Sequence, residues 1–296
     1  MSILWMTSLR PIGKSKENDK IQEIFISSIQ SIKQNIILSL TQFDDVGVEE
    51  YVKNKRINNY FTNFPKRNLP RGKKYSNKIM LNNALDQLLE NNFEYFVYST
   101  ADLIVPPNIF DEVNNIKESI KNDKEFCALI YPNVLQKNGH IKSFTTPHYG
   151  IDIFIFRLHK SNIQKFKKAI KSWDQYDWGI NDNFYVSVCE LLNLQIYNIY
   201  KNIKIIKYEN DFETINENRN WQISSWKKNK EYFINFLRAN NLPVLYAHGS
   251  YYYLLIKILK LRDLNLNLVI VYFKFLFKSP KHLIQKFLRF FNTKWN

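Results

Sequence analysis

The sequence contains little cysteine, and even its most apolar part lacks a long uncharged run. Cys127 and Cys189 are its only cysteines, too few for a disulfide framework, and residues 1–20 lack the apolar centre of a signal peptide. In the apolar segment after residue 250, the longest uncharged stretch is 264–273, half of the roughly 20 residues that a membrane-spanning helix needs. We therefore expect a chain in a reducing, cytoplasmic compartment that does not cross a membrane.

Acidic residues are missing from residues 51–85, which hold nine bases, and residues 251–296 hold nine bases against the single acid Asp263. The net charge of the whole chain is +15, so these two segments carry all of the excess. Basic segments of this kind bind phosphorylated ligands, anionic membranes or nucleic acids. Zinc-ligand spacing, a helix-turn-helix pattern and RNP-like aromatics are missing from the sequence. No nucleic-acid partner is therefore expected, and a basic nucleic-acid-binding protein is kept only as an alternative.

Apolar residues, by contrast, are plentiful enough for a large buried core. Hydrophobic residues make up 45% of the chain and aromatic residues 16%, which excludes a disordered chain. Strand-like apolar runs alternate with segments of helical spacing. Strands are expected over residues 3–8, 35–42, 93–99, 126–131, 151–157 and 195–208, and helices over residues 21–32, 76–89, 106–120, 182–192 and 221–237. This alternation predicts an α/β domain with a mainly parallel central sheet flanked by helices.

Polar residues stand where three of the predicted strands end, at Thr7, Asp44 and Asp102. In sheets of this class, ligands bind beyond the carboxyl ends of the strands. A carboxylate at a strand end is held rigidly, and carboxylate oxygens are the ligands of hard divalent cations, which neutralise a diphosphate leaving group. Asp102 is therefore the first candidate for a metal ligand.

The segment around Asp102 reads Thr-Ala-Asp-Leu-Ile, from Thr100 to Ile104, and is followed by Val-Pro-Pro. It resembles the Asp-x-Asp segment of GT-A-fold glycosyltransferases of the bacterial surface-polysaccharide type, which make lipopolysaccharide or capsule. Thr100 replaces the first Asp of that pattern. Three further segments fall in the order that the family shows: Lys78-x-x-x-Asn82-x-Ala84, then Trp178-Gly179-x-Asn181-Asp182, and finally His248 followed by Gly249.

The resemblance covers residues 1–250 and implies a GT-A-like catalytic domain. Such a domain transfers a sugar from a nucleoside-diphosphate sugar, here a UDP- or GDP-sugar, to a glycan or lipid-linked acceptor. The family pattern implies these roles: Lys78 and Asn82 at the diphosphate, Asp102 and His248 on Mn²⁺ or Mg²⁺, and Trp178, Gly179 and Asn181 at the acceptor. Thr7 and Asp44, which stand at strand ends, are expected to border the nucleoside. Asp182 is the implied general base of an inverting reaction.

Each of these residues also has a purely structural interpretation, which the sequence leaves open. Asp182 could cap the N-terminus of the helix that follows it, a position where Asp is common. Lys78 and Asn82 could be surface residues of an amphipathic helix, and His248 could be a hydrogen-bonded loop histidine. Trp178 could belong to the core.

Residues 251–296 form a basic, aromatic-rich segment after the predicted catalytic domain. Ser279 and Pro280 predict the start of a helix, one as its cap and the other as its first residue. Leu283, Ile284, Phe287, Leu288 and Phe291 share one face of that helix. An apolar stripe flanked by bases is typical of a helix lying in an anionic membrane surface. We expect peripheral attachment to the inner face of the cell membrane; packing on the core or on a partner subunit is the alternative.

A second nucleotide motif lies between Ser8 and Ser15. Gly13, Lys14 and Ser15 match the Gly-Lys-Ser end of a P-loop, but Ser8 replaces its first Gly. A P-loop kinase or NTPase, with Mg²⁺ on Asp102, is therefore the alternative enzyme. Against it, Pro11 removes an amide from the phosphate cradle, and the polar residues 16–20 predict that the helix starts only at Ile21.

Overall fold

The chain folds into an α/β domain built on two sheets. The computed structural model describes residues 1–69, 75–120, 124–132, 134–137, 140–143, 151–173, 181–199, 203–209, 219–242 and 244–248. The main sheet contains β1 (Ser2–Thr7), β2 (Asn35–Gln42), β3 (Asn59–Asn63), β4 (Tyr95–Ser99), β6 (Phe126–Ile130), β9 (Ile153–Arg157) and β10 (Gln195–Ile199). The smaller sheet contains β5 (Leu103–Ile104), β7 (Val134–Lys137), β8 (His140–Ser143) and β11 (Ile206–Glu209).

Helices alternate with these strands along the chain. The α-helices are α1 (Lys16–Gln30), α2 (Val48–Asn54), α3 (Asn77–Glu90), α4 (Ile109–Ser119), α5 (Lys160–Ala169), α6 (Asn181–Leu191) and α7 (Arg219–Ala239). Short 3₁₀ helices are η1 (Lys66–Asn68), η2 (Ile170–Ser172) and η3 (Val244–His248). Within the described part of the chain, no helix combines the length and the hydropathy that crossing a membrane requires.

The main sheet has the strand order β10-β6-β9-β4-β1-β2-β3. All neighbours in it are parallel except at β9, which runs antiparallel to both β4 and β6. The smaller sheet has the order β5-β11-β7-β8. The predicted α/β fold with a mainly parallel central sheet and flanking helices is therefore confirmed.

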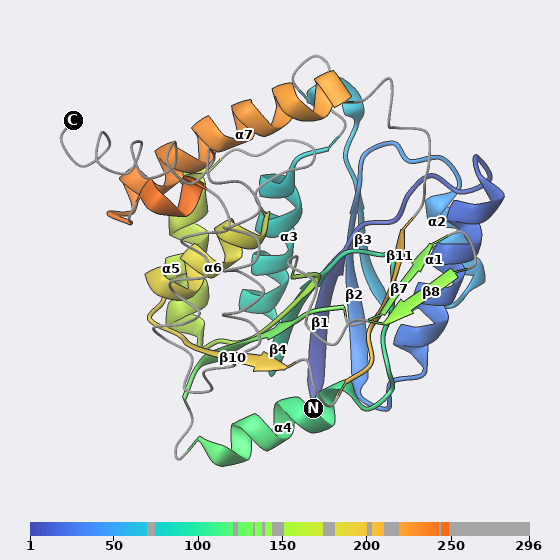
Figure 1. Ribbon diagram of the computed structural model, residues 1–296, viewed down its shortest axis with the longest axis horizontal. Helices are drawn as coiled ribbons and strands as arrows, with labels where there is room; N and C mark the ends of the chain where they lie inside the picture. Colours follow the sequence, from blue (N-terminus) through green and yellow to red (C-terminus); the bar gives the residue numbers. More distant parts are fainter. Residues whose placement is uncertain are drawn as a thin grey trace.

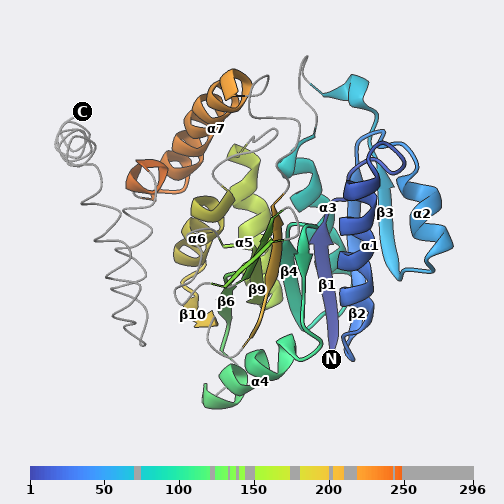
Figure 2. The same cartoon turned by 45° about the vertical axis from the view of Figure 1, so that its right-hand side comes forward.

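Both faces of the main sheet are buried, because successive side chains of a strand point to opposite faces. In β1, Leu4 and Met6 join one apolar cluster, and Ile3 and Trp5 join the other. The first cluster includes α3, α5, α6 and α7, and the second includes α1, α2 and α4. Figures 1 and 2 show α5, α6 and α7 on one side of the sheet and α1 and α2 on the other.

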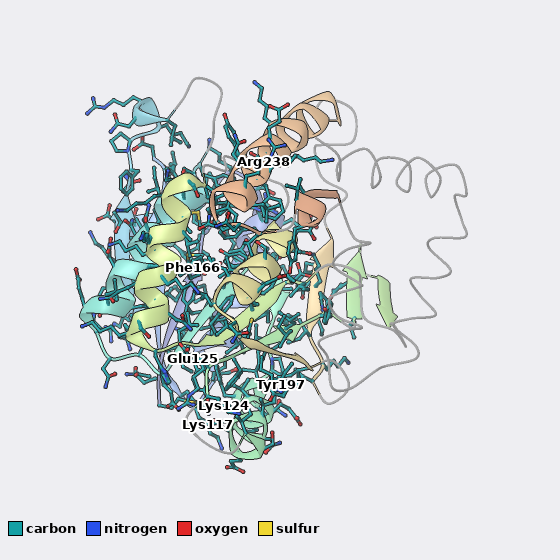
Figure 3. All side chains as sticks on the ribbon, turned by 90° about the vertical axis from the view of Figure 1, so that its left-hand side faces the viewer. Lys117, Lys124, Glu125, Phe166, Tyr197 and Arg238 are labelled. Atoms are coloured by element: carbon teal, nitrogen blue, oxygen red, sulfur yellow. The ribbon has the colours of Figure 1, made fainter. Side chains whose placement is uncertain are left out.

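Polar contacts join the segments at the amino ends of the parallel strands. These ends lie near α4 and the start of β1 (Figures 1 and 3). Lys117 of α4 forms an ion pair of 2.5 Å with Glu94, which precedes β4. Glu125, which precedes β6, accepts hydrogen bonds from the His159 backbone amide and from the Asn162 side chain at 2.5 and 2.6 Å. Figure 3 shows Lys117, Lys124 and Glu125 gathered at this end of the molecule. This edge is held together by contacts within the chain.

The start of α1 differs from the prediction. The helix begins at Lys16 rather than at Ile21, and Ser15 is its N-cap, with its hydroxyl accepting from the Asn18 amide. Glu17 and Asp19 lie in the first turn, where the helix dipole favours negative charge. Capping and charge therefore begin the helix before its apolar periodicity does. The sequence prediction also lacked β3, β5, β7, β8, α2 and α5.

The hydrogen bond between Trp5 and Ser99 gives a test of how the strands are joined. The Trp5 indole Nε1 donates to Ser99 Oγ at 2.7 Å, and both side chains are buried. We expect Ser99→Ala to lower the free energy of unfolding by about 1–3 kcal/mol, because it leaves a buried donor without an acceptor. Urea denaturation measures the change. Ser119→Ala, which removes an exposed hydroxyl from α4, is the control and should stay within about 0.5 kcal/mol of wild type; equal losses in both variants would contradict this role of Ser99.

Candidate functional site at the carboxyl edge of the sheet

The direction of β9 brings a new acidic residue to the carboxyl edge of the parallel strands. Ile153, the first residue of β9, pairs with Ser99 at the end of β4 and with Ile130 at the end of β6. Asp152 precedes Ile153 and therefore lies beside the segment that follows β4. That segment contains Thr100 and Asp102.

Lys207 brings a positive charge to this edge. It belongs to β11, where it pairs with Leu103 of β5, the residue after Asp102. Its ammonium forms an ion pair with Asp152 Oδ1, and the two side chains are only 19% and 7% exposed. Asp102 and Asp182 also act electrostatically on the Lys207 ammonium. One carboxylate thus pairs with Lys207, and two others from different segments act on it electrostatically.

Asp182 reaches this group from the first turn of α6. Its Oδ2 accepts a hydrogen bond of 3.0 Å from the backbone amide of Ile151, next to Asp152. Since α6 begins at Asn181, Asp182 lies inside the helix, and its carboxylate binds a different segment of the chain. Asp182 and Asp102, both predicted from the sequence, therefore act electrostatically on the same ammonium.

The charged groups shift one another's proton affinities. Burial raises the pKa of Asp182 to about 7, and the neighbouring Asp152 acts in the same direction, whereas the Ile151 amide and Lys207 oppose the rise. Burial alone would lower the pKa of Lys207, but Asp152, Asp102 and Asp182 together raise it. The lysine therefore stays charged at neutral pH. The pKa of Asp182, by contrast, lies close to neutral pH.

Asp102 is held by its neighbours on both sides. The Thr100 hydroxyl donates to Asp102 Oδ1, and the Asp102 carbonyl accepts from the Tyr208 amide at 2.9 Å. Among the side chains that the structure describes, no three Asp, Glu, His or Cys residues form a group that could hold a metal ion. Of His248, the structure describes the backbone in η3 but not the side chain. The described residues therefore do not fit the predicted metal site, and the ion pair with Asp152 places the Lys207 ammonium at the same edge.

Thr7 and Asp44, the residues predicted to border a nucleoside, differ in environment. Thr7 ends β1 and is 1% exposed, and its hydroxyl has no hydrogen-bond partner within the described part of the chain. Asp44 is exposed after β2 with φ of 51°, and its Oδ2 accepts from the Lys66 amide at 2.6 Å. Thr7 is therefore a buried polar group that a ligand could satisfy, whereas Asp44 anchors η1.

Lys78 and Asn82 lie in the first turns of α3, which begins at the carboxyl edge. The Asn83 side-chain amide donates to Thr41 Oγ1, near the end of β2, at 3.1 Å. This hydrogen bond fixes this part of α3 to that edge. Lys78 Nζ donates to the Lys171 carbonyl of η2 at 3.0 Å. Other bases of residues 51–85 also have partners within the chain: Lys53 with Glu49, Lys55 with Glu23, and Lys66 with Asp45.

The predicted acceptor residues fall mostly outside the described part. Trp178 and Gly179 lie outside the described residues, and for Asn181 only the backbone at the start of α6 is described. Their proposed contact with an acceptor stays a prediction.

The loop between β1 and α1 does not present a phosphate cradle. Gly13 has φ of 81°, and its amide donates to both carboxylate oxygens of Asp19, at 3.0 and 3.1 Å. A P-loop directs amides of this kind at a phosphate. Because Asp19 already occupies the Gly13 amide, the P-loop alternative is not favoured, although its helix does begin directly after Ser15.

Asp152 and Lys207 are the two site residues that sequence reasoning missed. Asp152 precedes an alternating strand, and only the reversed direction of β9 makes it part of the carboxyl edge. Lys207 is one of several lysines in residues 201–207, and nothing in its local sequence separates it from exposed Lys204. Both were missed because long-range pairing decides their place.

Comparisons with known proteins support the fold. No family model matches the chain, and no curated protein matches it. Among solved structures, residues 1–349 of S. aureus TarS in complex with UDP-GlcNAc match with a TM-score of 0.53 and 11% identity, covering 87% of this chain and 72% of that one. A second structure of TarS 1–349 matches with a TM-score of 0.52 and 9% identity, covering 83% and 68%. The chain therefore shares the GT-A-like fold of these structures.

The raised pKa of Asp182 predicts a specific pH dependence of stability. Its folded-state pKa of about 7 exceeds its ordinary value of 3.8, so folding favours the protonated form and stability falls as pH rises between these values. Asp182→Asn keeps an acceptor for Ile151 but cannot ionise. We expect this variant to have a higher free energy of unfolding than wild type. The difference between the two proteins should be about 2 kcal/mol larger at pH 8.5 than at pH 5.5.

Urea denaturation of both proteins at the two pH values measures this difference. Asp111→Asn, at an exposed carboxylate of α4, is the matched control, and its effect should be the same at both pH values. An Asp182→Asn effect that does not change with pH would show that Asp182 is ionised throughout.

Proposed function

We propose that the protein is a glycosyltransferase that moves a sugar from a nucleoside-diphosphate sugar to a glycan or lipid-linked acceptor. The observation that carries the proposal is a buried carboxylate, Asp182, whose Oδ2 accepts from the Ile151 amide at the carboxyl edge of a GT-A-like sheet. Asp102 follows β4, and Asp182, whose pKa burial raises to about 7, lies in the first turn of α6. This edge is where ligands bind in open α/β sheets. The TarS structure that shares the fold contains UDP-GlcNAc, which makes a UDP-sugar the first donor to test.

In the proposed reaction, Asp182 acts as the general base of an inverting displacement. The acceptor hydroxyl oxygen attacks the anomeric carbon and forms the new glycosidic bond. The bond between that carbon and the donor's diphosphate oxygen breaks, and its electron pair leaves with the nucleoside diphosphate. The hydroxyl proton passes to Asp182. A base whose pKa lies near the working pH can both take this proton and release it afterwards.

The remaining roles rest on the sequence and on position. Thr7 would contact the nucleoside, since its buried hydroxyl has no described partner, and Asp44, Lys78 and Asn82 would line the same edge. The acceptor and the attachment to an anionic, cytoplasmic membrane surface rest on residues 174–180 and 251–296, which lie outside the described part.

Nucleotide binding tests the proposal directly. A thermal-shift panel of UDP, GDP, CMP and ATP should show stabilisation by UDP or GDP, because a ligand that binds only the folded state raises its stability. Thr7→Val replaces the hydroxyl by a methyl group of similar shape. It should leave the stability of the free protein unchanged or higher, and it should weaken binding of the nucleotide about fivefold.

Thr41→Val provides the contrast for Thr7→Val. The Thr41 hydroxyl already accepts from Asn83, so this change should lower the melting temperature of the free protein. Stabilisation by ATP alone would contradict the proposed glycosyltransferase.

The proposed base is tested by turnover of the donor that the panel selects. Asp182→Asn should lower kcat about 10²–10⁴-fold, the usual contribution of a general base. In wild type, kcat/KM should rise with pH through about 7 and then level off, because protonated Asp182 cannot accept a proton. Steady-state kinetics between pH 5.5 and 9 measures both effects. An Asp182→Asn variant within tenfold of wild type would eliminate Asp182 as the base.

A further inference from the structure

Lys207 lies where the sequence predicts a divalent cation. The sequence assigns the metal to Asp102, at the end of β4. In the structure, β11 pairs with β5 so that Lys207 stands opposite Leu103, directly beside Asp102. Its ammonium pairs with Asp152, and Asp102 and Asp182 contribute to the same electrostatic environment.

The surroundings of Lys207 favour a fixed cation over an exchangeable one. Both members of the Lys207–Asp152 pair are largely buried, so the ammonium is not a solvated surface charge. Removing one partner from such a pair leaves an uncompensated buried charge, which is strongly destabilising. Thr100, in place of the first Asp of the metal-binding pattern, contributes a hydroxyl that donates to Asp102 rather than a further carboxylate.

We propose that the Lys207 ammonium takes the place of the divalent metal at this edge, as the built-in cation that pairs with Asp152 beside Asp102. The free protein then binds no Mn²⁺ at this edge, and the nucleotide binds without a divalent cation. The second statement rests on the proposed glycosyltransferase function, and the first does not. In this role Lys207 is a positioning residue for Asp152 and a fixed positive charge beside Asp102.

Mn²⁺ binding to the free protein is the direct test. Mn²⁺ is titrated to 1 mM, which is on the order of the dissociation constants of the weaker protein sites for hard cations. Electron paramagnetic resonance should then show no Mn²⁺ bound to wild type. Lys207→Ala leaves the buried Asp152 carboxylate without its partner, and a hard cation, which prefers carboxylate oxygens, is a group that can replace the lost positive charge. This variant should bind one Mn²⁺ per chain, and Mn²⁺ should raise its melting temperature but not that of wild type.

Two further variants separate charge from folding. Lys204→Ala removes an exposed lysine three residues earlier and should behave like wild type. Lys207→Arg keeps the positive charge and should also bind no Mn²⁺. If Lys207→Ala does not fold without metal, the wild-type and Lys207→Arg titrations still decide. Stoichiometric Mn²⁺ binding by wild type, or a folded Lys207→Ala that binds none, would overturn the built-in cation.

Nucleotide binding with EDTA or with Mn²⁺ tests the second statement. The affinity of wild type for the stabilising nucleotide should agree within about twofold in the two conditions; an affinity at least tenfold higher with Mn²⁺ would overturn it and favour the metal on Asp102 and His248. If no nucleotide binds in either condition, the proposed function fails, while the Mn²⁺ titrations of the free protein still decide the role of Lys207.

Discussion

The direction of one strand determines which charged side chains meet at the functional edge. Because β9 runs against β4 and β6, its first residues lie at the carboxyl ends of its neighbours. Asp152 therefore lies next to the segment that carries Asp102, and the adjacent Ile151 amide holds Asp182 in the first turn of α6. A parallel β9 would place the same residues at the opposite edge, so the site depends on this reversal more than on any single contact.

The two edges of the sheet differ in how well their buried polar groups are paired. At the amino edge, Glu94 and Glu125 have partners within the chain, in contacts of 2.5–2.6 Å. At the carboxyl edge, the Thr7 hydroxyl is buried without a described partner, and burial raises the pKa of Asp182 to about 7. Both features cost folding free energy, since a buried polar group is stable only when it is paired. Costs of this kind concentrate at sites that a ligand completes.

Patterns in neighbouring residues predicted those features of the fold and the site that depend on the local sequence. Apolar periodicity identified the α/β alternation, and polar residues at strand ends identified Asp102. The helix α1 began earlier than predicted because Ser15 and Asp19 act through capping and charge, which apolar spacing does not reveal. Asp152 and Lys207 could not be found in this way, because the strand pairings that place them join residues far apart in sequence. Their side chains are ordinary ones for short polar segments, and only the topology gives them a role.

Charge matching links the departure at Thr100 to the lysine in β11. Replacing the first Asp of the Asp-x-Asp pattern by Thr removes one negative charge from the edge, and Thr100 instead donates a hydrogen bond to Asp102. A divalent ion would then have one carboxylate fewer to bind it. An ammonium carries a single positive charge and therefore needs fewer carboxylates to balance it. Lys207 also differs from a metal ion in being tethered: its position is fixed by the pairing of β11 with β5, so the charge is in place before any ligand arrives. A preorganised charge of this kind needs no rearrangement when the ligand binds.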